Sequence, residues 1–238
     1  YAREIGRTVA NTPASSSDSV AELVMAHMYT MARHLHDANR KMPVEGAGQF
    51  AALKKKYAKG VELGGKTLGV IGIGRIGQAT ARLALGAGMR VIAFDPYSAL
   101  ASIEVKIHGM GKLNVPIERV SMKELLAQSD FISLHVPKQA NGAAVLGAAE
   151  LASMKKGSFL VNAARGGVVD ETALIAALDS GHLAYAALDV FENEPTPRED
   201  LMKHAKISLT PHIGAATLEA QDRIGEELAD LIFEHFES

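Results

Sequence analysis

Apolar residues recur at helical spacing between residues 19 and 40, the first stretch of the sequence with a clear pattern. The positions that share one side are Val20, Leu23, Val24, His27 or Met28, Met31 and Leu35. Residues three and four apart lie on one face of a helix, so this spacing predicts a long amphipathic helix. Ser19 and Glu22 have the spacing of a capping box at its start, and the proline and glycines of residues 41–49 predict its end.

From residue 66 onward, short runs rich in β-branched residues alternate with segments of helical spacing. The runs are TLGVIG, RVIAF, DFISLHV, SFLVNA, AYAALDV and KISLT. Alternation of this kind is typical of a parallel sheet with helices on both faces. The pattern therefore predicts an α/β fold built on a doubly wound parallel sheet.

Polar residues mark the ends of several of these helices. Ser121 with Glu124, and separately Asp170, predict helix starts, whereas Gly181 predicts a helix end. The last helix is predicted over residues 217–236. One side of that helix carries Ile224, Leu228, Leu231, Ile232 and Phe236.

Composition narrows the class of partner. The 238 residues are 47% hydrophobic, enough for a sizeable core, and 25 basic side chains face 27 acidic ones. Without a net positive charge to attract nucleic acid or an anionic membrane, we expect a small-molecule partner, and the run Lys54–Lys56 is interpreted as a solvated helix face. The absence of cysteine excludes disulfides, thiolate metal ligands and a cysteine nucleophile, and no metal site is predicted. The sequence shows neither an apolar run of roughly 18 residues nor a basic-then-apolar leader, and we expect a cytoplasmic protein.

A glycine loop follows the first predicted strand. Gly72, Gly74 and Gly77 fit G-x-G-x-x-G, the loop opens a helix rich in Ala and Leu, and the next strand ends at Asp95. In such units the first glycine permits the tight turn, the second lets the backbone approach a pyrophosphate, and the third allows close packing of helix on strand. An acid at the position of Asp95 accepts hydrogen bonds from the adenosine ribose and repels a 2′-phosphate. With no arginine nearby in the sequence, the pattern predicts NAD rather than NADP; the alternative is a glycine-rich packing turn that binds nothing.

Four ionisable side chains follow the ends of predicted strands. Arg165 comes after SFLVNAA, Asp189 ends AYAALDV, Glu194 lies in the next loop, and His212 follows KISLTP. Ligands of open α/β sheets bind outside the carboxyl ends of the strands. We therefore expect these side chains to face the same crevice as the glycine loop.

Their chemistry complements that of a nicotinamide. Hydride transfer leaves the protein to supply a proton, charge stabilisation and orientation. Histidine is the natural proton donor near neutral pH, and a carboxylate beside it would fix its tautomer and keep the acid form available. An arginine can hold a substrate carboxylate through two parallel hydrogen bonds. Arg165, Glu194 and His212 thus have the parts for interconverting a 2-oxo acid and a 2-hydroxy acid.

Each of these side chains also has a simpler interpretation. Arg165 could cap a turn, Glu194 could be a solvated loop acid, and His212 could be a packed turn histidine. His135 also closes a strand and competes for the role of the acid, although a wall of the cofactor pocket suits its position better. The other histidines are expected on helix surfaces without a special role, among them His27, His34 and His36.

Together these stretches resemble the D-isomer-specific 2-hydroxyacid dehydrogenase family. The matching segments run in family order over nearly the whole chain: NTPASSSDSVAEL, ELGGKTLGVIGIGRIG, FDPY, SDFISLHVP, MKKGSFLVNAARGGVVDETAL, ALDVFENEP and LTPHIGAAT. The resemblance implies a Rossmann domain that binds NAD, with Arg165 binding substrate, Glu194 supporting the histidine and His212 acting as general acid or base. It also implies that Asp189 meets the nicotinamide amide. The implied NAD contacts are Gly72, Gly74, Arg75, Ile76, Gly77, Asp95, Val136, Pro137, Ala163, Ala164, Arg165, Asp189, His212 and Gly214.

The resemblance covers one half of such an enzyme. Family members normally begin with a substrate-binding half of roughly a hundred residues, and almost all of it is absent from this sequence. We expect residues 1–18 to be a remnant of that half and of the hinge, and residues 19–238 to be the NAD-binding domain with an N-terminal hinge helix. Such a fragment should bind NAD(H) yet turn substrate over slowly or not at all.

Two segments depart from the family pattern. Residues 101–120, ASIEVKIHGMGKLNVPIERV, exceed the usual connector, and we expect them to change an exposed loop. Residues 138–147, KQANGAAVLG, replace a stretch that commonly contains threonine, and we expect a changed rim of the cofactor pocket.

The resemblance implies oxidation of 3-phosphoglycerate by the full-length enzyme. Within the enzyme class, glycerate, lactate or another 2-hydroxy acid is the alternative, because the discriminating contacts lie mostly in the other half. Outside it, the alternative is a redox-sensing corepressor or scaffold on the same fold. The long apolar helix and the family's habit of pairing through cofactor domains predict a homodimer.

Overall fold

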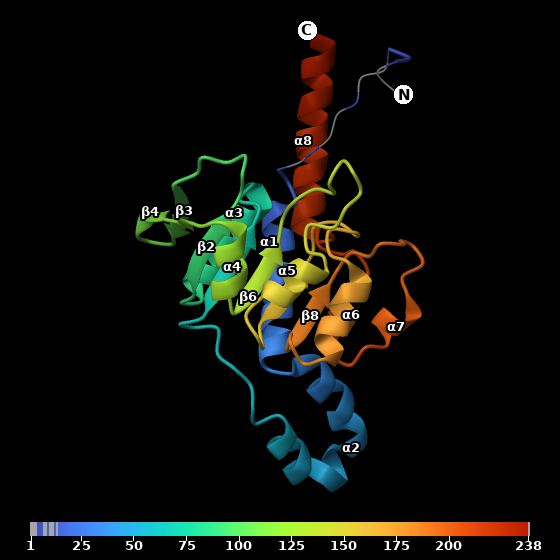
Figure 1. Cartoon of the computed structure of the whole chain (residues 1–238). Helices are drawn as coiled ribbons and strands as arrows, with labels where there is room; N and C mark the ends of the chain where they lie inside the picture. Colours follow the sequence, from blue (N-terminus) through green and yellow to red (C-terminus); the bar gives the residue numbers. More distant parts are fainter. Residues whose placement is uncertain (1–3, 7–8, 10–11, 13, 238) are drawn as a thin grey trace.

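A parallel sheet lies at the centre of the computed structural model, which describes residues 4–6, 9, 12 and 14–237 (Figure 1). Among these residues the sheet has seven strands in the order β5-β2-β1-β6-β7-β8-β9. The strands are β1 (Thr67–Ile71), β2 (Arg90–Phe94), β5 (Glu118–Arg119), β6 (Phe131–Leu134), β7 (Phe159–Asn162), β8 (Tyr185–Leu188) and β9 (Ile207–Leu209). Every neighbouring pair is parallel, and the strand order reverses beside β1, which gives the sheet a topological switch point.

Successive residues of the central strands pack on opposite faces of the sheet. Val70 and Phe131 belong to the apolar cluster on one face, whereas their neighbours Ile71 and Ile132 belong to the cluster on the other. Side chains alternate across a strand, so a strand covered on both faces is apolar throughout. This double burial explains why the predicted strands stand out in the sequence as continuous apolar runs.

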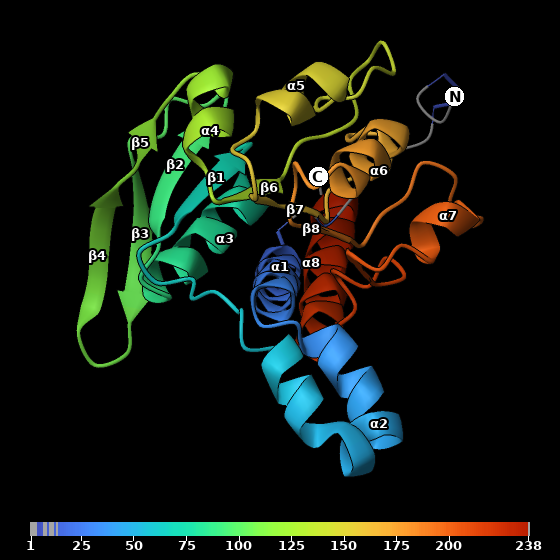
Figure 2. The ribbon, with the colours of Figure 1, turned by 60° about the horizontal axis from the view of Figure 1, so that its bottom comes forward.

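Helices cover both faces of the sheet (Figure 2). α1 (Ser17–Ala32) and α3 (Arg75–Gly86) contribute to one cluster. α4 (Met122–Gln128), α5 (Ala148–Ser153) and α6 (Glu171–Asp179) contribute to the other, and the short α7 (Glu199–Met202) follows β8. The prediction of a doubly wound α/β fold is therefore confirmed.

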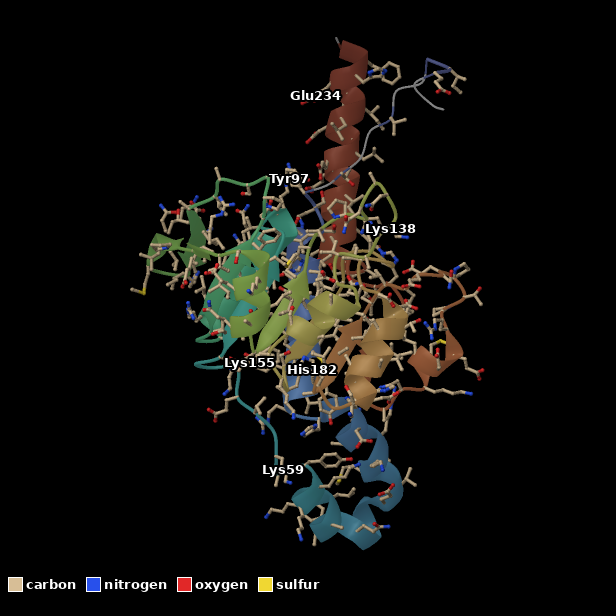
Figure 3. The ribbon with its side chains drawn as sticks, viewed as in Figure 1. Lys59, Tyr97, Lys138, Lys155, His182 and Glu234 are labelled. Carbon is tan, nitrogen blue, oxygen red and sulfur yellow. The ribbon has the colours of Figure 1, made fainter. Side chains whose placement is uncertain are left out.

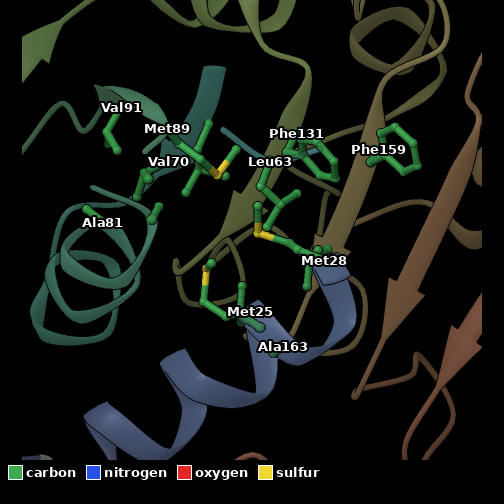
Figure 4. Packing of buried hydrophobic residues seen from close by; sticks show 14 of the residues in the cluster. Met25, Met28, Leu63, Val70, Ala81, Met89, Val91, Phe131, Phe159 and Ala163 are labelled. Carbon is green, nitrogen blue, oxygen red and sulfur yellow. The ribbon is translucent and has the colours of Figure 1, made fainter. Parts of the chain in front are cut away.

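The first helix packs directly on the middle of the sheet. Met25 and Met28 lie on the side of α1 that faces the sheet, where the rings of Phe131 and Phe159 stack with centroids 4.4 Å apart (Figure 4). Met28 is fully buried. Burying such a side chain contributes about 1.5–3 kcal/mol, so this face of α1 anchors the helix to the sheet.

Two details of the predicted first helix are wrong. α1 ends at Ala32, because His34 adopts a left-handed backbone conformation with φ 55°, and α2 (Leu35–Lys56) then runs through the segment expected to break the helix. Pro43 lies inside α2, and the chain bends at Gln49 instead of leaving the helix. The capping box at Ser19 does not form either, since that residue is already helical and its Oγ lies 2.8 Å from Thr217 Oγ1.

The helix starts predicted at Ser121 and Asp170 are confirmed. The Ser121 hydroxyl oxygen accepts a hydrogen bond from the Glu124 amide, and the Glu124 carboxylate accepts one from the Ser121 amide, which completes a capping box on α4. Asp170 caps α6 through the Ala173 amide.

The long connector over residues 101–120 is not a loop. It forms an antiparallel hairpin of β3 (Ser102–Ile107) and β4 (Gly111–Pro116) beside the main sheet. Gly109 and Gly111 supply the positive φ values of the turn, 78° and 89°. Ile103 is buried against the body, whereas most of the hairpin is exposed.

Two helices extend away from the body (Figure 1). α8 (Leu218–Glu237) matches the predicted last helix, but much of its apolar side is exposed, with Phe236 82% accessible. α2 projects from the opposite end of the molecule and exposes Val44 and Phe50. None of the described helices is both long enough and apolar enough to cross a membrane. The predicted boundary near residue 18 lies partly outside the described residues, which begin to be continuous at residue 14.

Candidate active site

The glycine loop joins the carboxyl end of β1 to the first turn of α3. Gly72 has φ 90°, and a Cβ there would lie 2.6 Å from the His135 carbonyl oxygen. A Cβ on Gly77 would lie 2.1 Å from the Gly72 carbonyl oxygen, so only glycine lets α3 pack this closely on the loop. A Cβ on Gly74 would instead meet nothing within 4 Å, and no side chain caps the first turn of α3. The open space above an uncapped helix N-terminus fits a pyrophosphate group.

Asp95 closes the adjacent strand β2 and faces the loop. Its Oδ2 accepts a hydrogen bond from the Ile73 amide at 2.9 Å, and its Oδ1 accepts from the amides of Tyr97 and Ser98. The sequence suggested no arginine nearby, but the fold brings Arg119 here, and its guanidinium donates to the Asp95 backbone carbonyl at 2.5 Å. The carboxylate is thus held by backbone amides, while the Arg119 guanidinium is bound to the backbone carbonyl of the same residue.

His212 and Glu194 meet beyond the ends of β9 and β8. The Nδ1 atom of His212 lies 2.8 Å from Glu194 Oε2, and Glu194 Oε1 accepts a hydrogen bond from the Phe191 amide at 2.8 Å. Nδ1 is therefore engaged, and Nε2 of the ring is the nitrogen left to meet a ligand. His212 adopts a left-handed backbone conformation with φ 55°, which is strained for a side chain with a Cβ.

The electrostatics of this pair favour an ionised carboxylate. Burial pushes the pKa of Glu194 upward, but hydrogen bonds from His212 and the Phe191 amide outweigh it and hold the pKa below its usual value. The charge of Lys138 acts in the same direction. Glu192, two residues earlier, serves another purpose, because its Oε1 accepts from the Glu171 amide at 3.2 Å.

Arg165 follows β7 in a turn whose backbone is held by the side chain of Asn162. Buried Asn162 donates from Nδ2 to the Arg165 carbonyl at 3.1 Å and accepts from the Ala164 amide at 3.1 Å. The guanidinium of Arg165 is exposed and donates to the Ala164 carbonyl at 2.6 Å. Arg165 thus shares the sheet edge with His212 and Glu194 but has no direct hydrogen bond to either. Sequence reasoning missed Asn162, although a polar residue closing an apolar strand was the available signal.

Asp189, at the end of β8, is almost completely buried and holds the turn that carries His212. Its Oδ1 accepts from the Thr210 hydroxyl at 2.6 Å and from the Ile213 amide at 2.9 Å. Its Oδ2 accepts from the Gly214 amide at 2.8 Å. One lone pair of Oδ2 is left for a further donor.

The histidines differ from expectation at several positions, since His34 lies between α1 and α2 and His108 lies in the turn between β3 and β4. His27 is buried, at 4% exposure, and its two ring nitrogens lie 3.0 Å from the hydroxyls of Ser208 and Thr210, so it does not lie on a helix surface. The helical pattern had already placed it on the apolar side of α1. His135 does not fit the role of the acid. Burial lowers its pKa to about 3, so it is neutral near neutral pH and cannot donate a proton as an imidazolium. His34 and His36 are half-buried.

The site residues predicted from the sequence lie at the carboxyl edge of the sheet. This edge also carries Val136 and Pro137 after β6, Ala163 and Ala164 after β7, and Arg75 and Ile76 at the start of α3. Tyr97 and Lys138 mark this edge, and Lys155 and His182 mark the opposite one (Figure 3). An apolar cavity of about 510 Å³ opens beside His212, and Leu209, Pro195 and Met202 contribute to its walls. No group of three or more His, Asp or Glu side chains among the described residues is arranged to hold a metal ion.

A doubly wound sheet with a glycine loop at its switch point and an acid at the end of the next strand defines a dinucleotide-binding domain of the Rossmann class. The chain belongs to the D-isomer specific 2-hydroxyacid dehydrogenase family, whose NAD binding domain matches residues 25–214. The family membership, the fold and the NAD cofactor expected from the sequence are thereby confirmed.

The relatives carry several names. The chain is 43% identical to a hydroxypyruvate reductase of Thermotoga maritima, over 98% of this chain and 71% of the relative. It is 40% identical to a D-3-phosphoglycerate dehydrogenase of Mycobacterium leprae, over 95% of this chain but only 40% of the relative. A solved D-lactate dehydrogenase from Aquifex aeolicus, complexed with NAD and lactic acid, superimposes with a TM-score of 0.80 at 30% identity and covers 100% of this chain and 72% of its own.

Proposed function

We propose that this chain is the NAD-binding domain of a dehydrogenase that oxidises 3-phosphoglycerate to 3-phosphohydroxypyruvate. The observation that carries the proposal is the 2.8 Å contact between His212 Nδ1 and Glu194 Oε2, on the same sheet edge as the glycine loop. A histidine oriented by a carboxylate is the proton-transfer unit that a carbinol–carbonyl interconversion requires. Because the chain spans only part of its relatives, the activity is proposed for the full-length protein.

Each side chain of the unit has one task. A bound nicotinamide cofactor would supply the hydride acceptor for oxidation, as NAD, and the hydride donor for reduction, as NADH. His212 takes the hydroxyl proton on Nε2 during oxidation and gives it back to the carbonyl oxygen during reduction. Glu194 stays ionised, fixes the Nδ1–H tautomer and stabilises the imidazolium.

Arg165 is proposed to hold the substrate carboxylate. Its exposed guanidinium at the end of β7 is free to turn from the Ala164 carbonyl toward a carboxylate with two parallel hydrogen bonds. The Asn162 side chain holds the backbone of this turn, so the Arg165 guanidinium can change position while the backbone stays in place.

The proposed cofactor contacts follow from the loop geometry. The amides at the start of α3, in Arg75 and Ile76, suit the pyrophosphate, and Asp95 suits the adenosine ribose. The free lone pair of Asp189 suits the nicotinamide amide. Residues 19–238 then constitute the cofactor domain with its hinge helix.

Hydroxypyruvate is the second candidate substrate, favoured by the relative at 43% identity that covers more of its own length than the phosphoglycerate dehydrogenase does. The deciding experiment is a panel of 2-oxo acids assayed with NADH on the full-length protein. We expect the highest kcat/KM with phosphohydroxypyruvate, and a preference for unphosphorylated hydroxypyruvate would select the alternative.

The control variant is His212→Asn, which suits the left-handed backbone and removes the proton donor. It should bind NADH and lose turnover. If the full-length wild type bound NADH and reduced no 2-oxo acid, the scaffold or corepressor alternative would replace the enzyme.

We also propose that two copies pair through the projecting α2. The apolar side of α1 is used within the chain, so the homodimer expected from that helix needs another surface. α2 offers one, because Leu35, Val44 and Phe50 are each more than half exposed. Light scattering should give a dimer for the wild type and a monomer for Phe50→Glu.

A further inference from the structure

A chain of hydrogen bonds connects the buried face of α1 to the turn of His212. His27 lies between two hydroxyls, with Nδ1 3.0 Å from Ser208 Oγ and Nε2 3.0 Å from Thr210 Oγ1. The Thr210 hydroxyl continues the chain to Asp189 Oδ1 at 2.6 Å. Four side chains from α1, β9 and β8 are thus linked in one line.

The protons of this line can have only one arrangement. The Thr210 hydroxyl donates its single proton to Asp189 Oδ1, so Thr210 Oγ1 must accept from His27. Burial lowers the pKa of His27, with the charge of Asp189 acting weakly against it, so the ring is neutral and has a single N–H. That proton is on Nε2, and Nδ1 accepts from Ser208. All donors point toward Asp189.

Asp189, the last residue of this hydrogen-bonded chain, holds the strained backbone turn at His212. Asp189 accepts from the amides of Ile213 and Gly214, the two residues that directly follow His212. A left-handed conformation at a histidine persists only where the surroundings hold it. The Asp189 carboxylate is the group that does so, and Thr210 in turn sets the position of Oδ1.

We propose that His27 is a positioning residue for the reaction: through Thr210 and Asp189 it fixes the backbone turn from which His212 presents its ring. This role rests on the function proposed above. His27 itself touches neither cofactor nor substrate.

A packing role alone does not account for a histidine here. The neighbouring positions on the buried side of α1 are apolar, including Val24, Met28 and Met31. An apolar side chain would fill the same space without the cost of burying two ring nitrogens. The ring is matched to its surroundings because both nitrogens face hydroxyls of β9 and its extension, Ser208 and Thr210.

The first test uses the protein without substrate. Nitrogen NMR of the histidine rings should show His27 protonated on Nε2 and bare on Nδ1. In His27→Leu, the exchange of the Ile213 and Gly214 amide protons should become about tenfold faster, because Thr210 loses its donor and Asp189 its fixed partner. A ring protonated on Nδ1, or unchanged exchange in His27→Leu, would overturn the proposal.

The second test separates positioning from packing. In the full-length protein, His27→Leu and Thr210→Val should each lower kcat about tenfold and leave KM for the 2-oxo acid within about twofold. His27→Gln, which can still accept from Ser208 and donate to Thr210, should recover most of the loss. Met31→Ala, a packing variant on the same helix, should lower Tm and leave both kcat and amide exchange unchanged. Equal kcat losses in Met31→Ala and His27→Leu would reduce His27 to a structural residue.

The two proposals can fail separately. If the wild type turned over no 2-oxo acid, the proposed function would be wrong, while the ring tautomer and the amide exchange would still decide whether His27 fixes the turn.

Discussion

The ionised state of Glu194 determines how the proposed proton donor works. Its pKa is held below 4.5 by hydrogen bonds from His212 and the Phe191 amide, in spite of partial burial. Glu194→Gln keeps the shape and removes the charge that stabilises the imidazolium. We expect kcat for 2-oxo acid reduction to fall on the order of a hundredfold, measured at saturating NADH.

Glu192→Gln is the matched control, since it makes the same change two residues away on a carboxylate that faces the Glu171 amide. It should leave kcat within about twofold of wild type. Comparable losses in both variants would contradict the assignment of Glu194 to the histidine.

The surroundings of Asp95 predict how the cofactor preference can be changed. Asp95→Ala removes the charge that repels a 2′-phosphate and leaves the Arg119 guanidinium 2.5 Å from the backbone carbonyl of the same residue. The preference for NADH over NADPH, as a ratio of dissociation constants from fluorescence titration, should fall at least about tenfold.

Adding Arg119→Ala to Asp95→Ala should cancel the gain in NADPH affinity while NADH binding stays weak. If NADPH binds equally well to the single and double variants, Arg119 has no part in the change.

At the scale of the element, α4 gives a measurable example of local sequence fixing local structure. Ser121→Ala removes the side chain that accepts from the Glu124 amide. The free energy of unfolding from urea titration should fall by about 1 kcal/mol. The control is Ser153→Ala, which removes an exposed hydroxyl that donates to the Glu150 carbonyl at the C-terminal end of α5. This variant should change the free energy of unfolding by less than about 0.5 kcal/mol.

Elements were predictable where their determinants are local. The buried strands are apolar on both faces, and Ser121 and Asp170 carry their caps in the sequence. The end of α1 was not predictable, because the left-handed residue there is His34 rather than a glycine. The hairpin of β3 and β4 was missed because its strands pair with each other and bury little more than Ile103.

The candidate site was also predictable only in part. Its positions at strand ends follow from sheet topology, so Arg165, Glu194 and His212 could be singled out from the sequence. The contacts that hold them join residues far apart in the chain: His27 reaches Thr210 across 183 positions. No local pattern encodes such a pair, and the arginine beside Asp95 was missed for the same reason.

For the whole molecule, buried histidines predict a stability that depends on pH. Burial lowers the pKa of His27, His36 and His135 below 6.5, for His135 to about 3. Below pH 6.5 the unfolded chain therefore binds protons that the native chain does not, and the free energy of unfolding falls as pH falls. Each such histidine contributes up to about 1.4 kcal/mol per pH unit until its folded pKa is reached.

Urea titrations at about pH 7, 6 and 5 should show this decline, and His135→Gln should make it shallower. Glu171 acts in the opposite direction, because burial raises its pKa and the native state binds its proton more readily just above pH 4.5. A free energy of unfolding that stays constant over this range would contradict the expectation.

The left-handed backbone at His212 bears on how the protein can change through mutation. At φ 55° a glycine would relieve roughly 1 kcal/mol of strain, so His212→Gly is a substitution that stability alone would favour. A population of variants selected only for heat resistance should therefore accumulate glycine at this position and lose the proton donor in the process. Position 212 should therefore be left out of mutant libraries that aim for higher thermal stability with the proposed activity retained.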